Sequence, residues 1–352
     1  MSADPVPVRD DLLEVEPYGA PQLDVAVQLN TNEPPYPPPA AYTELLCARL
    51  GGLRLNRYPD RRAWGLRGEL GARFGVPPEE VWAANGSNEV LAQLFQAYGG
   101  ADRTLLLFRP GYSAHPLIAK VAGTPVVEAD LDAGFSLSAG AARAAVQAHD
   151  PDIVCIARPN APTGVSIPFE AVRALHDSGR GLVIIDEAYA EFAVDDVTAL
   201  RGELPRLVVT RTFSKAWRLA GARLGYMLAP PWVVDGVRRV RLPYHLDALT
   251  QAAGLAALEL EKEMTAHVPE VIAERDRIRG ALLALGLEVA ESSGNFLLFR
   301  STATDLFDRL LAKGVLVRDF SSAPRLEGAL RVTVGTPEEN DRFVNALEES
   351  LI

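Results

Sequence analysis

Seven short apolar runs, each bounded by turn residues, are the feature that most limits how this 352-residue chain can fold. Runs this short and this apolar are typical of strands buried on both faces. They lie at 81–84, 104–108, 125–127, 152–157, 182–185, 207–210 and 224–229. Helical apolar spacing separates several of them, at 88–98, 138–149 and 169–178. This alternation predicts crossover units and hence an α/β large domain of three layers around a mostly parallel sheet.

The pattern changes after Pro243, where helical stretches at 249–265 and 268–285 precede further strands and helices. A single core seldom grows past roughly 250 to 300 residues, so a second lobe is expected. The segment 32–40 carries five prolines and suits a rigid extended strap, with a plain interdomain linker as the alternative. We predict an N-terminal arm and strap over 1–40, a large domain over 41–243 and a smaller α+β C-terminal domain over 244–352.

The last helix has a well-marked start. Thr336 is placed to cap it, Pro337 falls at its first position, and Glu339 follows three residues after the cap. This arrangement predicts a capping box.

Composition argues against several classes of partner. The formal charge of −11 disfavours nucleic acid, and no apolar run approaches the roughly 20 residues of a membrane span. Five arginines nevertheless cluster without forming a basic run, and we interpret them as a solvated or subunit-facing surface: Arg54, Arg57, Arg61, Arg62 and Arg67. Two cysteines imply no disulfide framework, and the five histidines lack metal-ligand spacing. We therefore expect a cytoplasmic protein with no nucleic-acid, membrane or metal partner.

A lysine with hydroxyl neighbours carries the strongest chemical signal. Lys215 follows Thr212 and Ser214, and Arg223 lies eight positions further on. Upstream, Asp186 ends an apolar run. Pyridoxal phosphate needs an amine for its aldehyde, a carboxylate for its ring nitrogen, and donors for its phosphate. Lys215 can bond to the aldehyde and Asp186 can pair with the ring nitrogen. Thr212, Ser214 and Arg223 can bind the phosphate. The combination indicates an enzyme that uses this cofactor.

Two further features belong to the same predicted sheet edge. Asp186 ends its strand where ligands of open α/β sheets bind, and its charge would favour a protonated pyridine ring. Gly86, Ser87 and Asn88 start a helix whose free N–H groups could face the cofactor phosphate, although alone they describe an ordinary helix start. Tyr112 could stack on the ring, with core packing as the alternative.

Four segments carry a resemblance to a known family. They are 29–36, 57–60, 219–226 and 330–336. On these segments and the lysine motif, the chain resembles fold type I pyridoxal phosphate aminotransferases over nearly its whole length. Within that class it is most similar to the histidinol-phosphate aminotransferases. The resemblance implies transamination of L-histidinol phosphate with 2-oxoglutarate, a reaction of histidine biosynthesis.

The resemblance also implies roles for individual residues. Lys215 would be the amine bonded to the cofactor, Asp186 the partner of the ring nitrogen, Tyr189 a donor to the ring oxygen, and Tyr112 the stacking aromatic. Tyr58 would reach the cofactor phosphate of the neighbouring subunit. A homodimer with shared active sites follows from that last role.

The substrate residues implied by the resemblance are Arg318 and Arg331, with Tyr18 and either Asn30 or Asn32 nearby. Two arginines on adjacent strands can fork onto a phosphate, whereas a generic amino-acid aminotransferase needs one arginine for a carboxylate. A surface salt bridge of Arg318 is the alternative interpretation.

One departure from the family pattern is Ala161, which stands where the family has an asparagine before Pro-Thr-Gly. Asn160 is the remaining candidate donor to the cofactor ring oxygen. Losing one neutral hydrogen bond costs about 0.5 to 1.5 kcal/mol, enough to tune the cofactor but not to abolish binding.

Other functions stay open at this point. The same scaffold could serve an aromatic or other amino-acid aminotransferase, or a decarboxylase of a phosphorylated amino acid. A non-catalytic regulator that binds pyridoxal phosphate is disfavoured, because the roughly 30 residues before the strap are too few and too acidic for a DNA-binding module.

Overall fold

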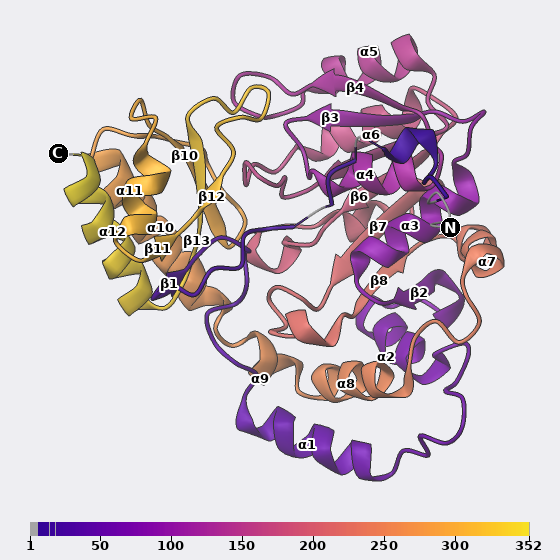
Figure 1. Ribbon diagram of the computed structural model, residues 1–352. Coiled ribbons are helices and arrows are strands. Elements are labelled where there is room, and N and C mark those ends of the chain that lie inside the picture. Colours follow the sequence, from indigo (N-terminus) through magenta and orange to yellow (C-terminus); the bar gives the residue numbers. More distant parts are fainter. Residues whose placement is uncertain (1–5, 14, 18, 352) are drawn as a thin grey trace, which may run out of the picture.

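The computed structural model describes residues 6–13, 15–17 and 19–351, and a seven-stranded sheet forms its centre (Figure 1). The strand order is β2-β8-β7-β6-β5-β3-β4. The strands are β2 (Val81–Ala84), β3 (Leu105–Arg109), β4 (Val126–Asp130), β5 (Ile153–Ala157), β6 (Leu182–Asp186), β7 (Leu207–Thr212) and β8 (Gly225–Leu228). Strand β8 pairs antiparallel with both β2 and β7, and the other pairs in this sheet are parallel. The predicted α/β class and mostly parallel sheet are confirmed.

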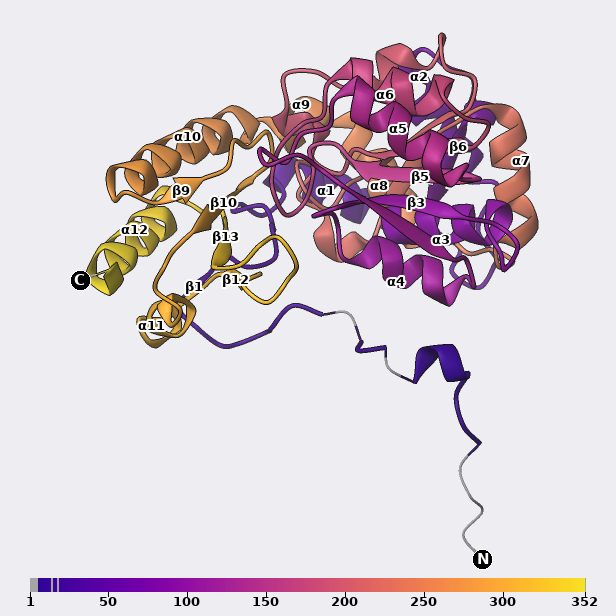
Figure 2. The same cartoon turned by 90° about the horizontal axis from the view of Figure 1, so that it is seen from above.

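Helices cover both faces of this sheet, as Figure 2 shows with α5 and α6 on one side and α3 and α4 on the other. The first side carries α5 (Ala139–His149) and α6 (Phe169–Asp177), and the second carries α3 (Ser87–Tyr98), α4 (Ala114–Val121) and α7 (Pro231–Val240). Along β6, Val183 and Ile185 pack toward the first side, whereas Leu182 and Ile184 pack toward the second. Burial on both faces explains why the sequence shows continuous apolar runs.

The second lobe is built on a four-stranded antiparallel sheet of order β12-β13-β10-β9. Its strands are β9 (Glu288–Val289), β10 (Phe296–Arg300), β12 (Arg318–Asp319) and β13 (Ala329–Thr333), and its helices are α10 (Val268–Ala284), α11 (Leu306–Ala312) and α12 (Pro337–Leu351). The capping box of α12 is confirmed, because Glu339 N donates to Thr336 Oγ1 (3.2 Å) and Thr336 N to the Glu339 carboxylate (2.8 Å).

The remaining helices lie beside the large sheet. They are α1 (Ala40–Gly51), α2 (Trp64–Phe74), α8 (Ala248–Glu259) and the short α9 (Glu261–Thr265). Helix α8 packs against α1 and α2. The predicted domain limits at residues 40 and 243 stay predictions. Short 3₁₀ turns lie at Asp10–Leu12, Pro78–Glu80, Ala190–Phe192, Val197–Leu200 and Ala220–Ala222.

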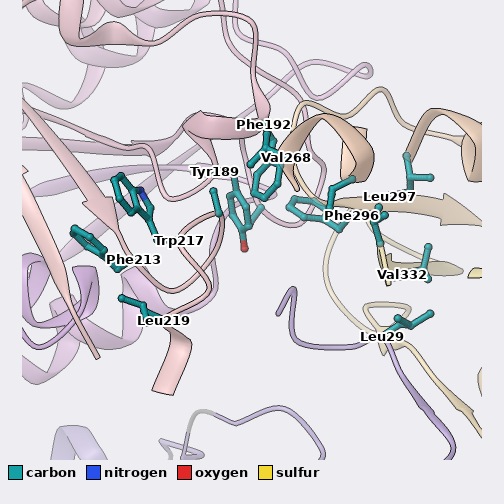
Figure 3. Close-up of a cluster of buried hydrophobic side chains, with 14 of the residues drawn as sticks. Leu29, Tyr189, Phe192, Phe213, Trp217, Leu219, Val268, Phe296, Leu297 and Val332 are labelled. Carbon is teal, nitrogen blue, oxygen red and sulfur yellow. The ribbon is translucent and has the colours of Figure 1, made fainter. Parts of the chain in front are cut away.

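The N-terminal arm joins the two lobes. Its strand β1 (Val27–Gln28) pairs in parallel with β11 (Val315–Leu316) of the second lobe. An apolar cluster continues from there into the large lobe, and within it Tyr189 and Phe296 meet edge to face with ring centroids 5.0 Å apart (Figure 3). This packing holds the two lobes together at the place where the strap passes between them.

Both cysteines, Cys47 and Cys155, are free. Within the described ranges, the helices are too short or too polar to cross a membrane.

Candidate active site

A cavity of about 470 Å³ lies between the lobes at the carboxyl ends of β6 and β7. It brings together most of the side chains that the sequence singled out, from segments far apart in the chain. Those that line it are Asn30, Asn32, Ser87, Asn88, Tyr112, Asp186, Tyr189, Thr212, Ser214, Lys215, Arg223, Arg318 and Arg331.

Asp186 is held at the end of β6 by two neighbours. Thr210 donates from Oγ1 to Asp186 Oδ1 (3.2 Å), and His115 Nε2 lies 3.1 Å from Asp186 Oδ2. All three residues are buried. A carboxylate fixed in this way has a set orientation and can serve as the partner of a cationic ring nitrogen.

His115 belongs to the candidate site, although the histidine spacing in the sequence gave no indication of it. It lies at the start of α4, and its ring meets Tyr112 edge to face. Burial alone would lower the pKa of His115, but the adjacent Cys155 and Asp186 raise it to about 10. With a proton on Nε2, the imidazole can donate to Asp186 Oδ2. No local sequence pattern marks this role, because the contact joins residues 71 positions apart.

An anion cradle forms at the other end of the cavity. Arg223 donates from Nη1 to Ser214 Oγ (3.2 Å), and the hydroxyls of Ser214 and Thr212 lie 3.0 Å apart. Gly86, with φ of 88°, precedes α3, and a Cβ there would lie 2.8 Å from Arg223 Nη2. The backbone conformation therefore favours glycine, and any side chain here would displace the Arg223 guanidinium from the cradle. Ser87 is the first residue of α3, whose N-terminus faces this cradle.

Lys215 reaches the cavity between these two ends. Its Nζ donates to the Thr31 carbonyl (2.9 Å) in the strap and lies 5.9 Å from the Tyr189 ring centroid. Burial, together with the nearby cations Arg331 and Arg223, lowers the pKa of Lys215 from 10.5 to about 7. A large fraction of this amine is therefore neutral, and so nucleophilic, at neutral pH.

The strap contributes through Asn32, whose side chain Nδ2 donates to the Tyr189 hydroxyl (2.9 Å). Asn32 is buried and adopts a positive φ of 54°. Thr333 Oγ1 donates to Asn32 Oδ1 (3.1 Å), so this residue ties the strap to both lobes.

Three predicted residues do not line the cavity. The Asn160 side chain donates instead to the Pro110 carbonyl (2.8 Å) and to Thr163 Oγ1 (3.0 Å), while its neighbour Ala161 faces the cavity. Tyr58 is 79% exposed and stacks on Tyr244 with centroids 4.3 Å apart. Gly86 does not line the cavity but lies against the Arg223 guanidinium of the cradle. Tyr18 lies outside the described residues.

Arg318 and Arg331 stand directly opposite each other in the β12–β13 register, so both side chains reach the same cavity. Arg318 donates from Nη1 and Nη2 to the Gly19 carbonyl (both 3.2 Å), and Arg331 donates from Nη2 to the Asn30 carbonyl (3.0 Å). These two guanidinium groups form a second cationic region, contributed by the smaller lobe.

The residues present fit pyridoxal phosphate. The cavity offers an amine of near-neutral pKa, a buried and oriented carboxylate, and a cradle that combines hydroxyls, an arginine and a helix N-terminus. These are the groups that the aldehyde, the ring nitrogen and the phosphate of this cofactor need.

Comparison with known proteins agrees with this chemistry. The family model for aminotransferase class I and II matches residues 24–347. The histidinol-phosphate aminotransferase of Frankia casuarinae is 47% identical, with 99% of this chain and 91% of the relative covered. That of Streptomyces avermitilis is 48% identical, with 98% and 97% covered. The crystal structure of the Sinorhizobium meliloti histidinol-phosphate aminotransferase with pyridoxal-5'-phosphate superposes with a TM-score of 0.84 at 25% identity, covering 93% of this chain and 91% of that one.

The lowered pKa of Lys215 gives a pH-dependent prediction. In the cofactor-free protein, labelling of Lys215 by an amine-acylating reagent should rise with pH to a midpoint near 7, because the neutral amine is the reactive form. Peptide mass spectrometry measures it, with exposed Lys262 as the reference for reagent reactivity. Arg331→Gln should move the midpoint upward, because it removes a cation that lowers this pKa. A wild-type midpoint above pH 9 would contradict the assignment.

The contact between His115 and Asp186 gives a second prediction. His115→Phe should lower kcat about tenfold to a hundredfold, since a hydrogen bond to a charged group contributes about 1.5 to 3 kcal/mol. His115→Gln, which retains a donor, should recover part of that loss. The pH titration of the bound cofactor's visible absorbance should shift in the Phe variant. If His115 only fills space, the titration will stay unchanged.

Proposed function

The chain belongs to the class I and II aminotransferase family and uses pyridoxal phosphate, and on that premise we propose that it transfers the amino group of L-histidinol phosphate to 2-oxoglutarate in histidine biosynthesis. The observation that carries the choice of donor is the Arg318–Arg331 pair in the same cavity as Lys215. Two guanidinium groups suit a phosphate, whereas a carboxylate needs one. The relatives named for histidinol phosphate support the same choice.

When bound, pyridoxal phosphate supplies an electrophilic carbon and an electron sink for amino-group transfer. Lys215 provides the proton transfers, because an amine with pKa near 7 can take a proton from the substrate Cα and return it. Asp186, oriented by Thr210 and His115, offers its carboxylate to the ring nitrogen. The chain thus places a base and a fixed carboxylate in the same cavity.

Other residues would hold and orient the cofactor and the substrate. Ser214, Thr212 and Arg223 would bind the cofactor phosphate with the N-terminus of α3, and Tyr112 would stack on the ring. Tyr189, whose hydroxyl accepts from Asn32, would donate to the ring oxygen. Ala161 offers no side-chain donor, so Tyr189 would carry that contact without the amide found in the family pattern.

The proposed donor is tested by half-reaction absorbance spectra with L-histidinol phosphate, L-histidinol, phenylalanine and threonine phosphate. L-Histidinol phosphate should react fastest. Arg318→Gln should weaken its binding about tenfold to a hundredfold, because a charge-assisted hydrogen bond contributes about 1.5 to 3 kcal/mol. Binding of L-histidinol, which lacks the phosphate, should change little.

Arg173→Gln serves as the matched control, since this arginine pairs with Glu203 on the surface. A faster reaction with phenylalanine or threonine phosphate would overturn the proposed donor while leaving the aminotransferase chemistry intact.

The functional unit we propose is a homodimer with shared active sites. Tyr58 does not line the cavity of its own chain, and it is 79% exposed while stacked on Tyr244. A tyrosine in this position is free to reach the phosphate of a second copy's cofactor. We also propose a cytoplasmic location, where the two free cysteines would stay reduced.

Mixing two inactive variants tests the shared site. Tyr58→Ala and Lys215→Ala should each have little activity alone. After unfolding and refolding together in equal amounts, half of the dimers contain one of each chain, and each such dimer has one intact site. Activity should therefore recover to about a quarter of the wild-type value. Recovery is not expected if Tyr58 acts within its own chain.

A further inference from the structure

Six arginines line a second cavity of about 410 Å³, which shares no lining residue with the candidate active site. Its lining residues come from the segment just before and at the start of α2, from the edge strand β2, and from the end of α7 and the residue after it. Figure 1 shows these three elements near one another at the edge of the large sheet. Its lining consists of Arg61, Arg62, Arg67, Trp82, Asp235, Arg238, Arg239 and Arg241. The arginine cluster noted in the sequence thus meets a second set of arginines from α7.

The positive charge of this cavity is poorly balanced. Asp235 is the one carboxylate among the lining residues, and it pairs with Arg238 at 2.7 Å, with both side chains exposed. Arg67 is buried, and its guanidinium donates to the backbone carbonyls of Pro78 and Arg62. Burial, followed by the charge of Arg238, lowers the pKa of Arg67 to about 10. The nearby carboxylates Glu79 and Asp60 partly offset the charge of Arg67. Six guanidinium groups still converge on a cavity with a single carboxylate in its lining, in a chain whose formal charge is −11.

The geometry favours phosphate groups as the occupant. Guanidinium groups fork onto phosphate oxygens, and several that converge on one cavity can engage more than one phosphate at once. The Trp82 ring is already stacked on His245, with centroids 5.0 Å apart, and Arg67 lies 5.7 Å from its centroid. Trp82 is also 2% exposed, so it offers no open aromatic surface for a nucleobase.

We propose that this cavity binds a small soluble anion with two or more linked phosphate groups, recognised through the phosphates alone. The occupant would neutralise the exposed arginines Arg61, Arg62 and Arg239, which stand around the buried Arg67. The site is separate from the cofactor cradle, so its occupation does not compete with pyridoxal phosphate.

Isothermal titration of the holoenzyme with phosphate, pyrophosphate, tripolyphosphate and ATP tests the proposal. Pyrophosphate and tripolyphosphate should bind at least tenfold more tightly than phosphate, and their affinity should fall as salt rises, because exposed charges are screened. ATP should bind no more tightly than tripolyphosphate.

The double variant Arg61→Gln/Arg239→Gln should weaken pyrophosphate binding at least tenfold and leave transamination unchanged. Arg67 is left intact because its burial contributes to folding. Arg143→Gln, an exposed arginine on α5, is the matched control and should bind like the wild type.

Three results would overturn the proposal. The first is equal binding of pyrophosphate by wild type and double variant. The second is binding that is lost in Arg318→Gln instead, which would assign the anion to the candidate active site. The third is absence of binding together with a changed monomer–dimer equilibrium of the double variant in sedimentation, which would show that these arginines face a second copy of the chain.

Discussion

Removal of the Lys215 amine from water is the physical constraint on which the rest of the site depends. Its pKa falls to about 7 because β7 carries it into a cavity that the strap and the second lobe complete. The strap supplies the Thr31 carbonyl that accepts from Nζ, and the second lobe supplies the cation Arg331. The contact of Tyr189 with Phe296 across the lobes therefore has a chemical consequence, since a looser interface would return water and a high pKa to the lysine (Figure 3).

Two adjacent carboxylates at the end of β6 show how the fold separates charges. Asp186 faces the cavity and is paired with His115, while Glu187 turns to the opposite side, where Arg211 donates to its Oε2 from Nε (3.0 Å) and Nη2 (2.7 Å). Burial raises the pKa of Glu187 to about 7. Each carboxylate thus has its own partner, His115 for Asp186 and Arg211 for Glu187. Asp186 thereby remains available to a ligand in the cavity, while Thr210 and His115 hold its carboxylate in place.

Local sequence patterns predicted most of the fold and much of the site. Both follow from the strands, because apolar runs mark where the strands lie and the site residues come at the strand ends. Continuous apolar runs marked the strands, and the carboxyl ends of β6 and β7 then placed Asp186 and Lys215 at one edge. What the sequence could not predict depends on contacts between distant segments. His115 meets Asp186 across 71 positions and Asn32 meets Tyr189 across 157, and neither pairing leaves a local pattern. The direction of the Asn160 side chain has a similar cause, because one of its two acceptors is the carbonyl of Pro110, 50 positions away, and the other is Thr163.

The substrate arginines link specificity to the N-terminal arm. Arg318 donates twice to the Gly19 carbonyl, a neutral acceptor that leaves the guanidinium charge uncompensated. A phosphate offers two negatively charged oxygens to the same donors and should displace or share this carbonyl, since charge-assisted hydrogen bonds are stronger than neutral ones. The arm segment around Gly19 and Gln22 also lines the cavity, so binding of an anionic substrate and the position of the arm are energetically coupled. An amino donor without a phosphate could not replace the Gly19 carbonyl at Arg318. Discrimination between amino donors would then arise from this replacement as well as from the direct attraction between phosphate and guanidinium.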